Sequence, residues 1–173
     1  MVRWGEWKNT KMRCKSYEKV KIYDMLGMRM SGNYAFALQH MGEVLPKIGK
    51  HEEAMQKLKE CASIFEALGK IETENFANTL GIMGCVLGEM GKLKDAKRKL
   101  RKSVKTYEMV DMKESVKYAF TLQQMGKVLL KMKKHEEAIS KLKECADILD
   151  TLSMRKSPIY ADTLRMMGRG QLT

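Results

Sequence analysis

The sequence predicts an all-α fold of stacked helix pairs, an α-solenoid, and three observations support this prediction. The stretch from Tyr118 to Gly126 recurs in altered form at Tyr34, Phe76 and Tyr160, and each start lies 42 residues from the last. The units that begin at Tyr34 and Tyr118 share 23 identical positions. Each unit has apolar residues at helical spacing, and the chain has only two prolines. A fixed period of this size is typical of repeat arrays whose units pack on their neighbours.

The composition narrows the classes of protein to consider. A chain of 173 residues with 44% hydrophobic residues is long enough for one elongated repeat domain. No stretch approaches the 18 or so consecutive apolar residues of a membrane span, and the N-terminus lacks the apolar run of a signal peptide. We therefore expect a cytoplasmic protein. The four cysteines are expected to be buried thiols. They include no C-x-x-C pair, so the sequence predicts neither a metal site nor a cofactor.

The repeat register divides the chain into five segments, which we expect to form one continuous domain. Trp4 and Trp7 are expected to cover the exposed end of the first core, with a recognition role as the alternative. The segments are a half-repeat or capping helix at 1–33, repeat 1 at 34–75, repeat 2 at 76–117, repeat 3 at 118–159 and a half-repeat helix at 160–173.

Each full repeat is expected to hold two helices. In repeat 1 the first runs over 34–48 and stops at Gly49, and the second runs over 51–68 and stops at Gly69. Pro46 is expected to bend the first helix near its end, because it removes a backbone donor. The last unit opens with Ser157 and Pro158, a capping residue followed by proline in the first turn.

The small and large apolar positions carry a family resemblance. In repeat 1 these positions are Leu38, Met41, Gly42, Leu45, Gly49, Ala54 and Leu58. In order and spacing they resemble the tetratricopeptide repeat (TPR), and the 42-residue length resembles the longer variant found in kinesin light chain. The resemblance implies a right-handed superhelix of antiparallel helix pairs, with first helices lining a concave groove and second helices forming the convex back. HEAT-type pairs have a similar period but do not explain the small residues Gly42 and Ala54. These residues, and their equivalents in the other repeats, are expected to let the two helices of a unit pack closely.

The same resemblance implies which side chains face the groove. Amides there would match the backbone of an extended peptide, phenylalanines would offer an apolar floor, and the C-terminal cations would favour an acidic ligand. The alternative is an ordinary solvated polar surface. The groove residues expected are Phe36, Gln39, His40, Glu43, Asn78, Ile82, Phe120, Gln123, Gln124, Lys127, Lys131, Arg165 and Arg169, with Lys47, Cys85, Glu89, Asp162 and Met166 at further positions of the same faces.

A second candidate surface is the basic stretch 92–105, in which Asp95 is the only acidic residue. It predicts a possible basic convex patch of Lys97, Arg98, Arg101 and Lys102, which as a nucleic-acid binder would contact phosphates without sequence preference.

No nucleophile, base and orienting group form a recognisable motif, so we expect a non-enzyme. The sequence predicts a protein-interaction scaffold that binds an extended peptide, and acidic peptides are expected to be favoured. Association through the terminal helices, where Ala161, Leu164, Met167 and Gly168 have no second helix to pack on, and nucleic-acid binding are the alternatives.

Overall fold

The computed structural model describes the backbone of residues 4–171 and the side chains of residues 15–170. The side chains of Trp4, Trp7 and Cys14 lie outside the described residues. Over residues 4–171 all regular structure is helical, as predicted. The contacts divide the chain into two compact units, Met1–Ile71 and Glu72–Thr173. The single continuous domain stays a prediction.

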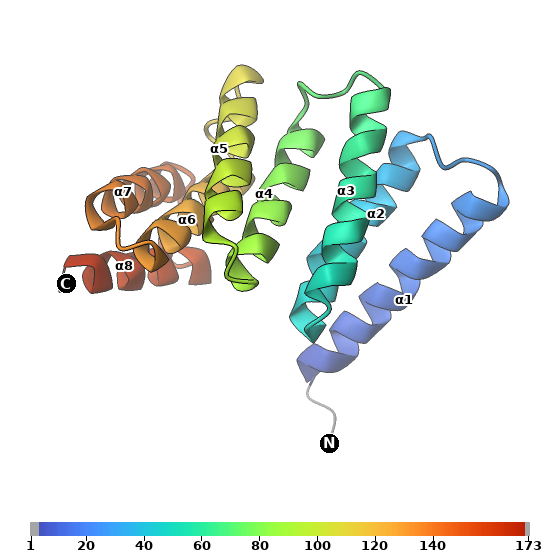
Figure 1. Cartoon of the computed structure of the whole chain (residues 1–173). Coiled ribbons are helices and arrows are strands. Elements are labelled where there is room, and N and C mark those ends of the chain that lie inside the picture. Colours follow the sequence, from blue (N-terminus) through green and yellow to red (C-terminus); the bar gives the residue numbers. More distant parts are fainter. Residues whose placement is uncertain (1–3, 172–173) are drawn as a thin grey trace. The chain divides into compact units, whose positions relative to one another are not determined.

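The first unit contains three α-helices and a short 3-10 helix. They are α1 (Trp4–Met25), α2 (Gly32–Val44), η1 (Leu45–Ile48) and α3 (His51–Ala67). Helix α2 packs against both α1 and α3 (Figure 1). The α-helical geometry ends at Val44 and Pro46 lies in the first turn of η1, because proline has no backbone N–H to continue the helix. The α-helix therefore changes to a 3-10 helix near the predicted place, and the predicted bend stays a prediction.

The second unit contains five helices. They are α4 (Glu74–Glu89), α5 (Leu93–Met109), α6 (Val116–Lys131), α7 (His135–Thr151) and α8 (Pro158–Gln171). Helices α4 and α5 form one pair and α6 and α7 the next, while α8 packs on α7 and α6 (Figure 1). The 42-residue period of the sequence thus appears as an alternation of first helices (α4, α6, α8) and second helices (α5, α7).

The same capping device begins every first helix. The hydroxyl oxygen of Ser31, Thr73, Ser115 or Ser157 accepts a hydrogen bond from the backbone N–H three residues later, at 3.2–3.3 Å. This bond satisfies one of the otherwise unpaired donors of the first turn. Because the four caps lie 42 residues apart, they keep every repeat in the same register.

Small residues bring the two helices of each pair into close contact. A Cβ atom at Gly84 would lie 2.5 Å from the Cγ of Leu100, and one at Gly126 would lie 2.6 Å from the Cγ of Leu142. Leu100 and Leu142 are fully buried. The predicted role of these glycines in close helix packing is therefore confirmed, and Gly42 has the same relation to Leu58 in the first unit.

A buried tyrosine ties the first helix of a repeat to the second. Tyr118 donates its hydroxyl hydrogen bond to Glu144 at 3.0 Å and approaches Glu108 at 3.2 Å. Burial first, and then the bond to Glu144, raise the pKa of Tyr118 above its ordinary value. Tyr34 makes the equivalent bond to Glu60 at 2.9 Å, and its pKa is raised for the same reasons.

No helix in the described part of the chain has the length and apolar character needed to cross a membrane.

Candidate functional site

The first helices of the second unit form the candidate binding surface. Helix α6 contacts α4 on one side and α8 on the other, so the outward faces of the three helices adjoin. On α6, Phe120 and Lys127 are exposed and Gln124 is half-buried. These residues lie at i, i+4 and i+7, which places them on one stripe of the helix. Asn78 and Ile82, half-buried on α4, belong to the same surface.

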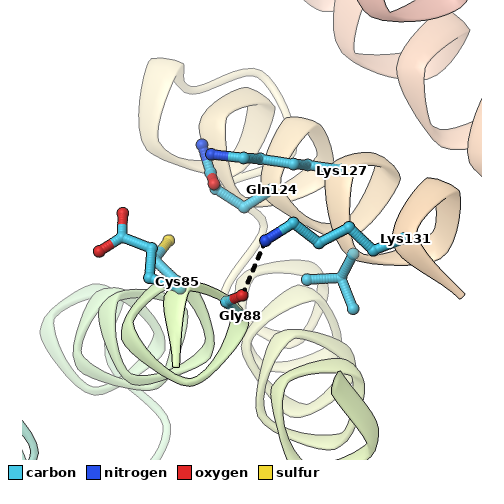
Figure 2. A pocket seen from close by; sticks show the side chains of 7 residues that line it. Cys85, Gly88, Gln124, Lys127 and Lys131 are labelled. Carbon is cyan, nitrogen blue, oxygen red and sulfur yellow. Dashed lines mark hydrogen bonds between the residues drawn. The ribbon is translucent and has the colours of Figure 1, made fainter. Parts of the chain in front are cut away.

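A small hollow lies between α4 and α6 (Figure 2). Its volume is about 10 Å³, which is close to the space of a single water molecule. Lys131 reaches across it and donates a hydrogen bond to the carbonyl oxygen of Gly88 at 3.0 Å. Gly88 lies in the last turn of α4, where carbonyl oxygens lack helical partners and carry partial negative charge. Lys131 therefore caps α4, a role that the sequence analysis did not anticipate.

The thiol of Cys85 lines the same hollow and is not an activated nucleophile. Burial raises the pKa of Cys85 to about 12, and the nearby Glu89 carboxylate adds to the rise while Lys127 opposes it. The thiol is therefore protonated near neutral pH. Among the described residues, no group of three or more potential metal ligands was found.

Gln123 is not available to a ligand, contrary to the prediction. Only 3% of the residue is exposed, and its side-chain amide donates hydrogen bonds to the Ile159 carbonyl at 3.1 Å and to the Thr163 hydroxyl at 3.0 Å. Both partners belong to α8, so Gln123 fastens α8 to α6. Gln39, at the matching position of α2, is also buried. The neighbouring Gln124 remains at the surface and contacts Gln123 at 3.4 Å.

The charges of α8 differ from the predicted basic row. Arg165 forms an ion pair with Asp162 one turn earlier, so these two charges offset each other. Arg169 is exposed, and neither it nor Lys127 makes an ion pair within the described residues. Met166, expected in the groove, is buried with 7% exposure. Lys127, Lys131 and Arg169 therefore carry the positive charge of this surface, and Glu89 on α4 opposes it.

The candidate residues of the first unit form a separate cluster on α2. The ring of Phe36 meets that of His40 edge to face, with centroids 4.5 Å apart, and His40 lies 3.3 Å from the Glu43 carboxylate. Phe36 and His40 also line a pocket of about 130 Å³ between α1 and α2. Its α1 wall, which sequence reasoning missed, includes Lys15 and Lys19.

The predicted basic patch on α5 is only partly formed. Lys97 turns toward α7 and forms an ion pair with Glu137 at 2.8 Å. Lys102 lies over the ring of Phe76, 5.2 Å from its centroid. Arg98 and Arg101 are exposed as expected, and Arg98 also pairs with Asp95 at 2.7 Å. The four predicted residues therefore do not share one face.

The sequence has no match among family models or among curated proteins. The fold, however, is similar to those of solved structures. BtubC (BKLC) from P. vanneervenii superposes with a TM-score of 0.76 at 15% sequence identity, over 94% of this chain and 65% of that chain. This chain therefore spans 65% of the length of that protein.

Two further crystal structures are of a kinesin light chain-like protein from Podosopora anserina, which has nearly identical TPR-like repeats. One superposes with a TM-score of 0.65 at 12% identity, over 94% of this chain and 86% of that chain. A variant of the same protein has a TM-score of 0.67 at 12% identity, over 94% and 85% of the two chains. The chain is therefore an all-α solenoid with the TPR-like repeat fold, as predicted.

Proposed function

We propose that this chain is a non-catalytic protein-interaction scaffold. The face formed by α4, α6 and α8 binds an extended segment of a partner protein that carries acidic residues. TPR-like repeat folds in general bind protein partners, and this supports the class of partner. The observation that supports this face is the stripe on α6, where Phe120, Gln124 and Lys127 present an apolar, an amide and a cationic side chain in succession.

Each type of side chain on the stripe suits one part of an extended peptide. Phe120 is 42% exposed and would cover an apolar side chain of the partner. The amide of Gln124 can both donate to and accept from a peptide backbone. Lys127, with Arg169 on α8, would attract carboxylates and favour acidic segments over basic ones. We expect an affinity on the order of micromolar, or about −8 kcal/mol, because ordering a flexible peptide offsets much of the contact energy.

An array of extended peptides with graded numbers of Asp and Glu residues tests this proposal. Gln124→Ala should weaken binding to all selected peptides, whereas Lys127→Glu should weaken binding to the acidic ones most. Lys113→Glu, in the exposed turn before α6, makes the same charge change away from the face and serves as the control. Equal effects of Lys127→Glu and Lys113→Glu would show that the peptides respond to net charge rather than to this surface.

Self-association is a second candidate function, and one observation on α8 favours it. Leu164 is 46% exposed, and Ala161 and Gly168 on the same side of the helix are also exposed. These positions correspond to those that pack on a second helix in the other repeats. A copy of the chain could cover them. Light scattering should then detect a species larger than 19.9 kDa that Leu164→Gln converts to monomer, and a monomer at all accessible concentrations would exclude this candidate.

A further inference from the structure

The outer face of α5 carries a continuous row of cations. Lys94, Arg98, Arg101 and Lys105 are all exposed and follow one another at i, i+4, i+7 and i+11, which places them on one stripe of the helix. The buried residues of α5, such as Leu100 and Tyr107, lie on the opposite side. We call these four residues the α5 stripe.

The other repeats provide internal comparisons for this stripe. At the same outer positions α3 has Glu52, Gln56, Lys59 and Ser63, and α7 has Glu136, Ser140, Lys143 and Asp147, all of them exposed. Their formal charges sum to 0 on α3 and −1 on α7, whereas the α5 stripe carries +4. The third position has a cation in all three helices, whereas the repeat fold does not require the cations at Lys94, Arg98 and Lys105.

The row of cations does not stabilise α5. Like charges three or four residues apart on a helix repel each other and destabilise it. Asp95 is the only acidic residue between Lys92 and Lys105, and its pair with Arg98 at 2.7 Å is exposed, so solvent screens it. Binding of an external polyanion would offset the repulsion between these cations.

We propose that the α5 stripe binds the phosphate backbone of a nucleic-acid duplex without sequence preference. The stripe is about 16 Å long, from eleven residues at 1.5 Å each, and a duplex carries roughly ten phosphate charges over that length. The two central guanidinium groups suit phosphates because each can donate two parallel hydrogen bonds. The aromatic residue of α5, Tyr107, is fully buried, so the stripe has no platform on which single-stranded bases could stack.

A duplex fits this surface better than an acidic protein segment does. An extended peptide carries at most one side-chain charge per residue, or per roughly 3.3 Å, whereas a duplex carries one per roughly 1.7 Å. A peptide also gains affinity from backbone partners and side-chain pockets, and the stripe consists of four cationic side chains alone. The site lies on α5 and shares no residue with the peptide-binding face of α4, α6 and α8.

A salt titration with a short labelled duplex DNA of random sequence tests the proposal. Four phosphate contacts predict that the logarithm of the binding constant falls with the logarithm of salt with a slope of about −3.6. Affinity should therefore drop about 150-fold between 50 and 200 mM salt. Absence of binding at 50 mM salt would overturn the proposal.

A stripe swap separates these four residues from the net charge of the protein. The triple variant Lys94→Glu, Arg98→Gln, Lys105→Ser gives α5 the residue types that α3 already carries, with Arg101 left in the place of Lys59. The net charge falls from +12 by two, one and one to +8. With one contact left, the slope should fall to about −0.9 and the loss of affinity between the two salts to about 3.5-fold.

The matched control makes the same charge change on exposed residues outside the stripe. Lys113→Glu, Lys133→Asn and Lys156→Gln also lower the net charge from +12 to +8, and this variant should keep the slope of about −3.6. Equal losses in the two variants would refute a site on the α5 stripe. Tighter binding of a poly-glutamate peptide than of the duplex would replace nucleic acid with an acidic protein as the ligand.

Discussion

One glycine position of the repeat should respond to alanine with opposite signs in different repeats. Gly126 lies in the middle of α6, and a Cβ atom there would be 2.6 Å from Leu142 Cγ, 2.7 Å from its Cδ2 and 3.4 Å from the Ala138 carbonyl oxygen. Gly168 holds the same position in α8, where nothing lies within 4 Å of an added Cβ. The two sites share their backbone role and differ in whether a second helix covers them.

The expected magnitudes follow from two opposing terms. Alanine is favoured over glycine in a helix by about 1 kcal/mol, and overpacking a filled core costs about 1–3 kcal/mol. Leu142 is fully buried and has little room to move, which places the overpacking cost at about 2–3 kcal/mol. Gly126→Ala should therefore destabilise the fold by about 1–2 kcal/mol. Gly168→Ala should stabilise it by up to about 1 kcal/mol, and by less if the last turns of α8 fray.

Thermal unfolding followed by circular dichroism measures both effects. Gly126→Ala should lower Tm by about 2–8 °C and Gly168→Ala should raise it by up to about 4 °C. Combining Gly126→Ala with Leu142→Ala should cost less than the two separate losses together, because the new methyl group enters space that the leucine vacates. Equal stabilisation by the two glycine substitutions, or strict additivity of the pair, would refute the packing argument.

Three further outcomes follow from single residues. Lys133→Gly should stabilise the protein by about 0.5–1 kcal/mol in urea unfolding, because Lys133 has a φ of 58° where Gly91 occupies the turn of the preceding repeat. In an alkaline titration by ultraviolet absorbance, Tyr118 should ionise above the ordinary tyrosine value of 10.0. The fold should lose stability as pH rises through that raised pKa, because burial and Glu144 favour the neutral phenol. Lys134 and then Lys97 lower the pKa of Glu137 to about 2. The stabilisation from Glu137 is therefore complete above pH 4.5, its ordinary pKa, and is lost as pH falls toward 2. Glu137→Gln should remove that part of the acid dependence, as measured by urea unfolding at several pH values.

The helices and their packing could be predicted because the capping residues and the small residues at helix contacts recur with the period of the sequence. Ser157 was expected to begin a helix, and its hydroxyl caps α8. Gly42 was expected to admit close packing, and Gly42, Gly84 and Gly126 each face a leucine. Four copies of the same cap and three of the same contact make one register far more consistent than any other. The boundary between the two compact units, by contrast, has no signal of this kind, because the turn before α4 is like the other turns.

The binding surface was predicted less well, and Gln123 shows the physical reason. Gln123 and Gln124 are chemically identical neighbours that are 100° apart on the helix. Helical periodicity places both near the boundary between the core and the surface. The choice between them depends on α8, whose Ile159 carbonyl and Thr163 hydroxyl accept the amide of Gln123. The hydrogen-bond partners of Gln123 belong to another repeat. The burial of Gln123 therefore cannot be predicted from the sequence of its own helix.

A count of the charges in the basic stretch of α5 does not define one surface, whereas a comparison of helix faces does. Lys97 and Lys102 are adjacent in sequence to Arg98 and Arg101, yet one turns to Glu137 and the other to Phe76. In a repeat protein, the equivalent outer positions of α3, α5 and α7 occupy the same place in the fold but differ in sequence. They can therefore be compared directly. A charge that every repeat carries is consistent with a role in the fold, whereas a charge that one repeat alone carries is not required by the fold. Lys94 and Lys105, which face solvent on α5 while α3 and α7 have acidic or neutral residues there, are charges of the second kind.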